Sequence, residues 1–360
     1  MPIGPLFPGY LLSNSCNKHD IYEGWSEQRK RVPKRKGQEM LNDPVLLNDW
    51  HVVSLAGDLV ENKPLGVRLL GEDIVLWRAG QTVCAWQDLC VHRGTKLSLG
   101  EVENATIICP YHGWNYDVTG QCIRYPSHPS QKPSEKAHAR VYRAQEKYGW
   151  VWMCMGSPER EIPKFEQWDD PAFRKVHCGP YRYKASGPRA IENFLDVTHF
   201  PFVHQTYLGD PAHAEVNDYP VEITPHGIIA SNISIWQPDP DGTGQGKTVT
   251  YTYKVHRPLT ASFVKASEGP RFAMYFTITP LTEEESTAWA YVAMDYSSLT
   301  DEEIRGFQDM ITLQDIPIVE SQRPELLPLD LQAELHLRSD RTAIAYRQWL
   351  RQLGLRMGTA

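Results

Sequence analysis

The chain has 360 residues, a formal net charge of −7, and hydrophobic and charged fractions of 41% and 22%. That length allows one or two domains with a substantial core, and the negative charge argues against nucleic acid as the main partner, because phosphate binding needs a clustered positive field. The sequence has no apolar run of roughly 18 residues and no signal-peptide pattern, so no membrane partner is expected. Its seven cysteines are an odd number, which favours a reducing compartment over a disulfide framework. The chain is therefore expected to be cytoplasmic.

Residues 1–44 are predicted to form a basic, disordered leader. Pro2, Pro5 and Pro8 oppose an early helix, and residues 29–36 form a basic run that we expect to be solvated. A nuclear, lipid or nucleic-acid contact is the alternative for this run. Met40 leaves open that the domain proper begins there.

Residues 45–157 are predicted to form a small all-β domain. Short segments rich in β-branched and aromatic residues are typical of strands, and glycines separate them. The segments lie at residues 50–53, 67–70, 74–77, 83–86 and 148–153.

Two ligand pairs lie within this region: Cys90-x-His92 and Cys109-x-x-His112, with sixteen residues between them. Two thiolates and two imidazoles at this spacing match a Rieske 2Fe-2S cluster, in which two cysteines hold one iron and two histidines hold the other. A mixed Cys/His zinc site is the alternative. A zinc site would not require the Pro-Tyr-His-Gly-Trp turn of residues 110–114, so this turn favours the 2Fe-2S cluster.

Residues 158–360 are predicted to mix strands and helices. One strand is expected at residues 181–185 and a helix at 190–199. Successive antiparallel strands follow at 228–236, 248–256, 261–265, 272–279 and 286–295, with a turn-rich link at 241–246. A helix over residues 301–322 is expected to begin at the N-cap Thr300, and a last helix to cover residues 341–353.

A second metal site is predicted from His199 and His204, which lie five residues apart near a helix end that Pro201 distorts. Two imidazoles and one carboxylate on one face of a metal are typical of non-heme Fe(II) oxygenases. The best candidate for the carboxylate is Asp315, because an acid among Ile, Pro and Val is unfavourable to bury without a partner. Glu320 is the alternative.

Over residues 45–350 the sequence resembles the Rieske non-heme iron oxygenases, oxygenase (α) component. The resemblance is carried by the two Cys/His pairs and by Glu192, Asp196, His199 and His204. The region of Asp315 resembles the homotrimeric branch that contains vanillate O-demethylase, dicamba and methylxanthine demethylases and the saxitoxin-tailoring hydroxylases. Residues 192–204, 208–210 and 338–350 look most similar to the saxitoxin-tailoring group.

The resemblance implies an α+β fold: an N-terminal all-β Rieske domain, then a helix-grip-like catalytic domain with a central antiparallel sheet and C-terminal helices. It also implies one 2Fe-2S cluster, one mononuclear Fe(II) and a head-to-tail homotrimer. Asp196, with Glu192 the other catalytic candidate, would bridge His112 of one subunit and His199 of the next. Electrons would come from a separate reductase, because the chain has no dinucleotide-binding loop.

The expected activity is hydroxylation of a C–H bond of a small substrate with dioxygen, first of all a guanidinium alkaloid. Oxidative N- or O-demethylation of a methylxanthine or methoxyarene is the alternative, and a pure Rieske electron carrier is the alternative from another class. We expect the substrate pocket to lie within residues 205–310. Aromatic candidates for its lining are Tyr207, Trp236, Phe263, Tyr275 and Tyr291. Asp210, Glu215 and Asp218 could contact a cationic substrate, but an exposed acidic loop is the favoured interpretation.

Overall fold

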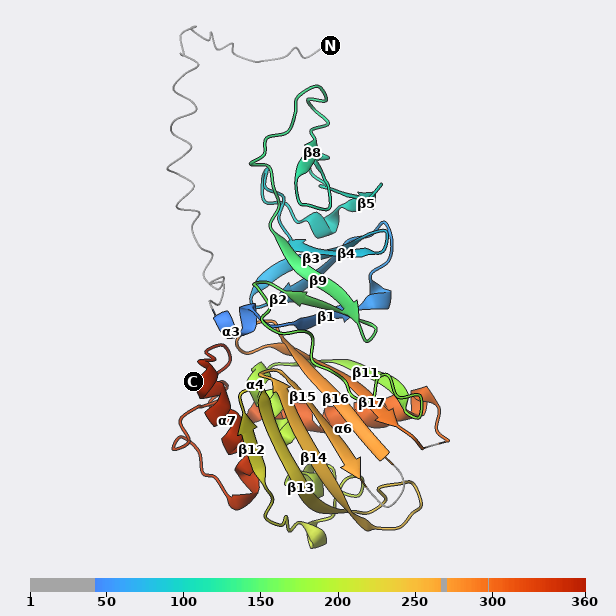
Figure 1. The fold of residues 1–360 in the computed structure, drawn as a ribbon, viewed down its shortest axis with the longest axis vertical. Coiled ribbons are helices and arrows are strands. Elements are labelled where there is room, and N and C mark those ends of the chain that lie inside the picture. The colour runs from blue at the N-terminus through green and yellow to red at the C-terminus, as the bar shows by residue number, and fades with distance from the viewer. Residues whose placement is uncertain (1–42, 267–270, 297) are drawn as a thin grey trace, which may run out of the picture. The chain divides into compact units, whose positions relative to one another are not determined.

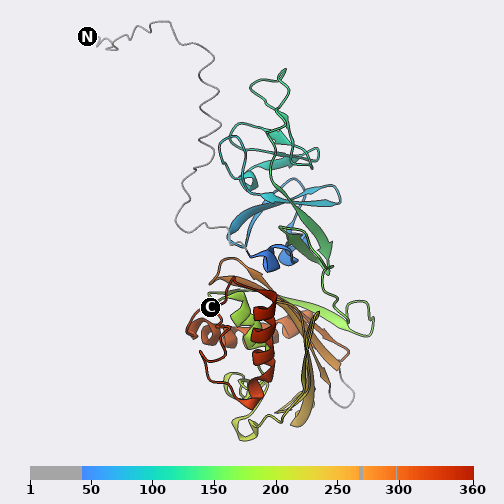
Figure 2. The same cartoon turned by 60° about the vertical axis from the view of Figure 1, so that its left-hand side comes forward.

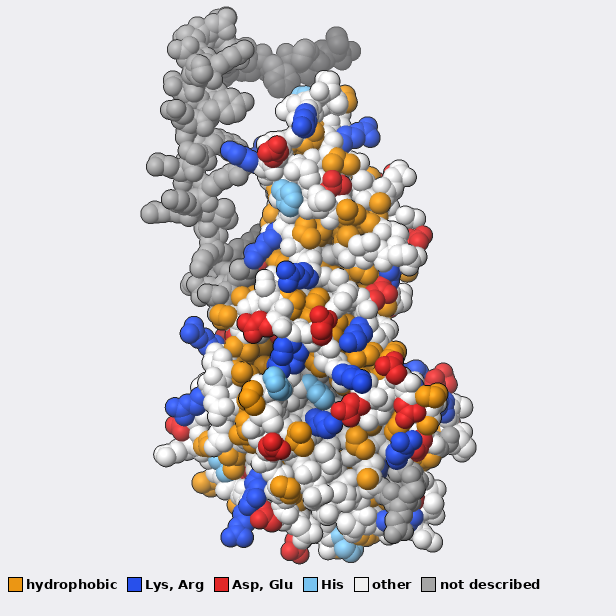
Figure 3. Space-filling model, in the orientation of Figure 1, with side chains coloured by type: hydrophobic (Ala, Val, Ile, Leu, Met, Phe, Trp, Pro, Cys, Tyr) orange, Lys and Arg blue, Asp and Glu red, His pale blue; other side chains and the backbone are white. Residues whose placement is uncertain are grey.

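The computed structural model describes residues 43–266, 271–296 and 298–360 (Figure 1). The leader predicted at residues 1–44 therefore lies outside the described residues, apart from its last two positions. The described part has the predicted α+β fold, with sheets throughout and the two longest helices near the C-terminus. No helix in these three stretches is both long and apolar enough to cross a bilayer. On the face drawn in Figure 3, basic and acidic side chains are interspersed.

The first sheet has six antiparallel strands in the order β1-β10-β9-β4-β3-β2. Trp77, Trp86, Trp150 and Trp152 are fully buried in it, so the predicted aromatic segments do form core strands. The helix α3 (Pro44–Leu47) and the turn η1 (Ala56–Asp58) flank the first strand. The strands are β1 (His51–Leu55), β2 (Leu65–Leu69), β3 (Glu72–Ala79), β4 (Thr82–Gln87), β9 (Val141–Lys147) and β10 (Trp150–Cys154).

A smaller four-stranded sheet supports the two predicted cluster loops. The loop of Cys90 and His92 precedes the turn η2 (Leu97–Leu99), and the loop of Cys109 and His112 joins β6 to β7. Gly113 closes the second loop by donating its N–H to the carbonyl of Cys109, and its φ of 65° is one that favours glycine. The strands are β5 (Glu101–Glu103), β6 (Thr106–Ile108), β7 (Asn115–Tyr116) and β8 (Cys122–Arg124).

The second half builds a seven-stranded antiparallel sheet in the order β11-β17-β16-β15-β14-β13-β12. Its strands lie close to the predicted segments, and the turn-rich stretch 241–246 joins two of them as expected. The strands are β11 (Arg174–Tyr183), β12 (Val221–Thr224), β13 (Gly227–Gln237), β14 (Lys247–Arg257), β15 (Thr260–Ala266), β16 (Arg271–Pro280) and β17 (Ser286–Met294).

The two faces of this sheet have different partners because side chains alternate along each strand. One face joins the helices in the main core, and Figure 2 shows the helices gathered against it. The other face packs on the first sheet, where the rings of Tyr291 and Trp150 have centroids 4.7 Å apart. The domain boundary expected after residue 157 stays a prediction, since both sheets contribute to this second core.

The helices differ from expectation at one place that matters for the site. The helix expected over residues 190–199 is instead α4 (Gly187–Leu195), followed by an extended Asp196 and then by α5 (Phe200–Val203). Pro201 lies in the first turn of α5, where its missing N–H has no helical partner to lose. It therefore begins a helix rather than distorting the end of one.

The two C-terminal helices are as predicted. Helix α6 (Asp301–Ser321) begins at Thr300, whose hydroxyl and backbone form a reciprocal capping box with Glu303. Helix α7 (Arg341–Leu353) ends at Gly354 in the left-handed conformation. The short turns η3 (Pro211–His213) and η4 (Arg338–Asp340) complete the described elements.

Candidate metal centres

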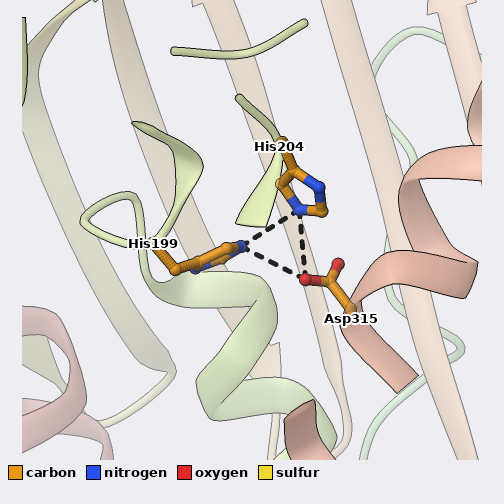
Figure 4. A group of neighbouring side chains, drawn as sticks. All are labelled: His199, His204 and Asp315. Atoms are coloured by element: carbon orange, nitrogen blue, oxygen red, sulfur yellow. Dashed lines mark hydrogen bonds and ion pairs between the residues drawn. The ribbon is translucent and has the colours of Figure 1, made fainter. Parts of the chain in front are cut away.

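Three predicted ligand side chains meet at one point (Figure 4). His199 directly precedes α5, His204 directly follows it, and Asp315 lies within α6. The Nε2 atoms of the two histidines are 3.2 Å apart. Oδ1 of Asp315 lies 3.3 Å from Nε2 of His199 and 3.1 Å from Nε2 of His204. Figure 4 shows all three side chains pointing toward one another.

The spacing of these three atoms fits one face of an octahedral metal site. Metal–ligand bonds of about 2.1 Å that meet at right angles separate neighbouring ligand atoms by about 3 Å. The observed separations are 3.1–3.3 Å. Two imidazoles and one carboxylate are also the ligand set of non-heme Fe(II) oxygenases. The residues present therefore fit an Fe(II) ion whose opposite positions stay open.

Hydrogen bonds fix the orientation of both imidazoles. Nδ1–H of His199 donates to Oδ2 of Asp196 over 3.0 Å, and Nδ1–H of His204 donates to Oε1 of Gln314 over 2.8 Å. These bonds leave both Nε2 atoms free to coordinate a metal. Gln314 was missed by the sequence reasoning. The sequence shows that Gln314 precedes Asp315, but it does not show that α6 passes next to His204.

The electrostatic field at the triad favours positive charge. Burial alone would lower the pKa of His199, but the carboxylates of Asp196 and Asp315 accept hydrogen bonds from its ring and raise the pKa to about 9. Burial would raise the pKa of Asp315, yet hydrogen bonds from His199 and His204 hold that pKa below its usual value. A bound cation would be stabilised by the same two carboxylates.

A cavity of about 640 Å³ opens beside the triad, between α6 and one face of the seven-stranded sheet. Tyr207 and Phe263 line it as predicted. Tyr275 and Tyr291 belong instead to the core on the opposite face of the sheet, because their positions in β16 and β17 alternate the other way. Trp236 stacks on His213, with ring centroids 4.3 Å apart, and lies outside the described lining. The cavity also extends beyond the predicted range, since Asn193 lines it and donates to Asp315.

The acidic loop after the histidines lies away from the cavity. Asp210 accepts a hydrogen bond from the N–H of Ala212 and so caps η3, and Asp218 forms an ion pair with Arg341. Neither these two acids nor Glu215 belongs to the described lining of the cavity. This agrees with the favoured interpretation of an exposed acidic loop and gives no support to the alternative, in which these acids contact a cationic substrate.

Glu192 and Glu320 both have partners away from the triad. Both carboxylate oxygens of Glu192 accept hydrogen bonds from the buried guanidinium of Arg347, over 2.5 and 2.6 Å. Glu192 is not among the described residues that line the cavity. Glu320 accepts a hydrogen bond from the backbone N–H of Lys184. Of the two candidates for the third ligand, the fold brings Asp315 to the histidines.

The first predicted metal motif forms a separate cluster of side chains. Cys90 and Cys109 are buried, and the His92 and His112 rings have centroids 4.6 Å apart. Nδ1 of His92 is buried without a hydrogen-bond partner, as expected of an atom that serves as a ligand. The ring of His92 stacks on Trp114.

Hydrogen bonding shifts the pKa values of the two thiols in opposite directions. The pKa of Cys90 is lowered to about 6, because the Cys109 thiol and the Tyr116 hydroxyl donate hydrogen bonds to its sulfur. The pKa of Cys109 is raised, since its proton is held by Cys90. Backbone N–H groups also donate to both sulfurs, and such bonds tune the potential of an iron–sulfur cluster. The residues therefore fit a 2Fe-2S cluster.

Two family models match the chain. One describes the Rieske [2Fe-2S] domain and matches residues 49–142; the other describes the vanillate O-demethylase oxygenase C-terminal domain and matches residues 183–356. Methylxanthine N1-demethylase NdmA of Pseudomonas putida is 31% identical over 335 residues, which are 88% of this chain and 92% of that protein. Methylxanthine N3-demethylase NdmB of the same organism is 27% identical over 352 residues, covering 89% and 94%.

Solved structures show the same relationship. The structure of Pseudomonas putida CBB5 NdmA with caffeine matches with a TM-score of 0.76 at 30% identity, over 85% of this chain and 90% of that one. Dicamba monooxygenase bound to dicamba matches with a TM-score of 0.71 at 22% identity, over 86% and 97%. At that identity it shows a shared fold.

Proposed function

The chain belongs to the family of Rieske non-heme iron oxygenase α subunits, and from this premise we propose that it demethylates a small organic substrate at nitrogen or oxygen. One structural observation carries the proposal. The three ligand atoms of His199, His204 and Asp315, 3.1–3.3 Å apart, face a cavity with largely apolar walls. Such a cavity can hold a methyl group beside a metal.

Enzymes of this family use one Rieske 2Fe-2S cluster and one mononuclear Fe(II) per subunit. We assign the cluster to Cys90, His92, Cys109 and His112. We assign the mononuclear iron to the triad of His199, His204 and Asp315. When bound, the cluster supplies single electrons and the mononuclear iron activates dioxygen.

The side chains around the triad have positioning roles. Asp196 and Gln314 hold the Nδ1 protons of the two histidines, which keeps both Nε2 atoms directed at the metal. Asn193 donates toward Asp315 over 3.5 Å and restrains the carboxylate. Glu192 is bound to Arg347, so we propose a structural role for it instead of the catalytic role expected from the motif.

The proposed reaction consumes one dioxygen and two electrons for each methyl group removed. The substrate methyl group, one dioxygen, two electrons and two protons give the demethylated substrate, formaldehyde and water. A C–H bond of the methyl group is replaced by C–O. The bond from that carbon to nitrogen or oxygen then breaks, and the proton of the new hydroxyl passes to the leaving heteroatom.

Demethylation is better supported than hydroxylation of a guanidinium alkaloid, which was the first expectation. The relatives NdmA and NdmB are methylxanthine N-demethylases, and a vanillate O-demethylase oxygenase subunit of Pseudomonas is 30% identical over 50% of this chain. Asp210, Glu215 and Asp218, the acids considered as contacts for a cationic substrate, lie outside the described cavity lining. A pure electron carrier would leave the triad and its cavity without a role.

We further propose a separate reductase as electron donor, a homotrimer and a cytoplasmic location. The side chain of Asp196 is one third exposed and His112 is exposed. Both therefore remain accessible for the proposed bridge, in which Asp196 of one subunit contacts His112 of a neighbouring subunit. A shared carboxylate would fix both imidazoles and shorten the path for an electron.

The test is substrate-dependent formaldehyde release. Iron-replete protein would be given a surrogate reductase and, separately, methylxanthines, methoxybenzoates and guanidinium alkaloids. We expect formaldehyde to appear in step with oxygen uptake for an N-methyl or O-methyl substrate. Oxygen uptake that yields a hydroxylated alkaloid, and no formaldehyde from any methylated compound, would reject demethylation.

A further inference from the structure

Lys265 is the only lysine or arginine among the described residues that line the cavity, and it lies apart from the histidines of the triad. It lies on β15, opposite Tyr251 of β14 and Phe272 of β16, on the face that Phe263 also occupies. Only 9% of Lys265 is exposed. A charge at this position interrupts a wall of aromatic and aliphatic side chains, and such burial is unfavourable unless the charge acquires a partner.

The contacts of Lys265 within the described residues include no ion pair, although Nζ lies over the ring of Phe272, 5.1 Å from its centroid. Nζ donates to the carbonyl of Pro240 over 2.8 Å and to Oε1 of Gln237 over 3.4 Å, and both acceptors are neutral. An ammonium has three N–H donors, and the third has no hydrogen-bond acceptor among the described residues. Gln237 is itself held by a hydrogen bond to Tyr251. The polar groups are therefore built into the wall around the ammonium.

Besides Asp315 of the triad, two acids line the cavity, and each has its own partner. Asp241 accepts hydrogen bonds from Lys247 over 2.6 Å and from Thr243 over 2.7 Å. Asp239 is exposed and accepts from the N–H of Gly244. Both lie in the loop between β13 and β14. They help to keep Lys265 protonated without forming an ion pair with it.

We propose that the substrate carries an oxyanion, a carboxylate or a sulfonate, which binds Lys265 while its methyl group faces the iron ligands. This inference rests on the proposed demethylation and adds the substrate class. An oxyanion would take the unused N–H and match the buried charge, and a charge-assisted bond of this kind is strong and directional. The aromatic rings of Tyr253, Phe263 and Phe276, which also line the cavity, would hold the apolar part.

Binding of matched acids and amides tests the inference. The probes are 4-methoxybenzoate against 4-methoxybenzamide, and toluene-4-sulfonate against toluene-4-sulfonamide, titrated anaerobically into the iron-replete full chain by calorimetry. Lys265→Gln is the test variant. Lys254→Gln is the matched control, because Lys254 lies on the neighbouring strand and pairs with Glu166, outside the described lining of the cavity.

We expect wild-type protein to bind at least one acid about tenfold or more tightly than its amide. Lys265→Gln should remove this preference while keeping the affinity for the amide, and Lys254→Gln should keep both. An equal affinity for acid and amide in the wild type, no binding of any probe, or an unchanged preference in Lys265→Gln would overturn the inference. The probe pair that shows the larger preference for the acid tells whether the site favours a carboxylate or a sulfonate.

Circular dichroism would show whether Lys265→Gln folds. If it does not, a second variant, Lys265→Arg, still tests the proposal. Lys265→Arg keeps the charge and should keep the preference for the acid, so its loss would count against the proposal. The two proposals can also fail separately. Formaldehyde release by a protein without acid preference rejects the role of Lys265 alone. Selective acid binding without formaldehyde from any substrate rejects demethylation alone.

Discussion

Nδ1 of His199 lies 3.0 Å from Oδ2 of Asp196, while Nε2 of the same ring lies 3.3 Å from Oδ1 of Asp315. One imidazole thus connects a partly exposed carboxylate to the centre of the triad. Asp196 is extended and follows the end of α4. The contact spans the break between α4 and α5.

Replacing Asp196 with Asn should separate metal binding from turnover. The amide keeps the size of the side chain but removes the negative charge that holds the His199 proton. We expect both metals to remain bound and product formation in a single turnover to fall by about 100-fold. Iron analysis and rapid-quench measurement on prereduced protein would show this, with Asp210→Asn as the control. An unchanged single-turnover rate would reject the bridging role.

Asp315→Ala should remove the mononuclear iron and leave the cluster. The two histidines alone supply too few ligands to hold Fe(II) firmly. Iron content should fall from about three to about two atoms per chain, while the reduced cluster keeps its paramagnetic signal. Glu320→Ala should keep all the iron, because Glu320 binds the backbone of Lys184. Equal iron content in the two variants would contradict the assignment of Asp315.

Arg347→Met should destabilise the fold. Arg347 is 2% exposed and pairs with Glu192 and Glu334. Its loss would leave the Glu192 carboxylate without its two hydrogen-bond donors, while Glu334 keeps its ion pair with Arg189. Breaking a buried ion pair in this way costs about 3–5 kcal/mol. Urea unfolding should show the loss, whereas the exposed pair of Arg323 with Glu325 should contribute about 0.5 kcal/mol or less. Arg347→Met and Arg323→Met with the same unfolding midpoint would argue against a structural role for Glu192.

The charge of Lys265 should depend on pH within the working range. Burial lowers its pKa to about 8. The titratable groups around it are Asp239 and Asp241 from the loop, Tyr251 opposite it on β14, and Tyr296, whose hydroxyl donates to the same Pro240 carbonyl as Lys265. Asp241 stays ionised, since Lys247 lowers its pKa to about 2. Burial raises the pKa of both tyrosines, so they stay neutral.

Lys265 is therefore cationic below about pH 8 and becomes neutral above it. The dissociation constant for the preferred acid should rise as pH increases from 7 to 9, whereas that for the amide should stay flat. Calorimetric titrations across this pH range, repeated with Lys265→Arg, would test whether deprotonation of Lys265 causes the rise in the dissociation constant. Arginine stays charged, so its acid affinity should be independent of pH. A parallel rise for acid and amide would point to another group.

The metal ligands could be predicted because they lie in local patterns: Cys90 with His92, Cys109 with His112, and His199 with His204. Asp315 required one further argument, the cost of burying an acid among apolar residues. The contact of Gln314 with His204 could not be predicted, because it depends on how α6 crosses the sheet. Lys265 was missed because the sequence of a strand does not show which of its two faces lies toward the cavity.

The most direct test of the account is one turnover of prereduced, iron-replete protein mixed with dioxygen, without a reductase. With a bound N-methyl or O-methyl substrate, we expect formaldehyde to form as the reduced cluster loses its paramagnetic signal. In Asp315→Ala the cluster should form but no formaldehyde should appear. Formaldehyde formation by Asp315→Ala at the wild-type level would contradict the central claim that His199, His204 and Asp315 hold the iron that oxidises the substrate.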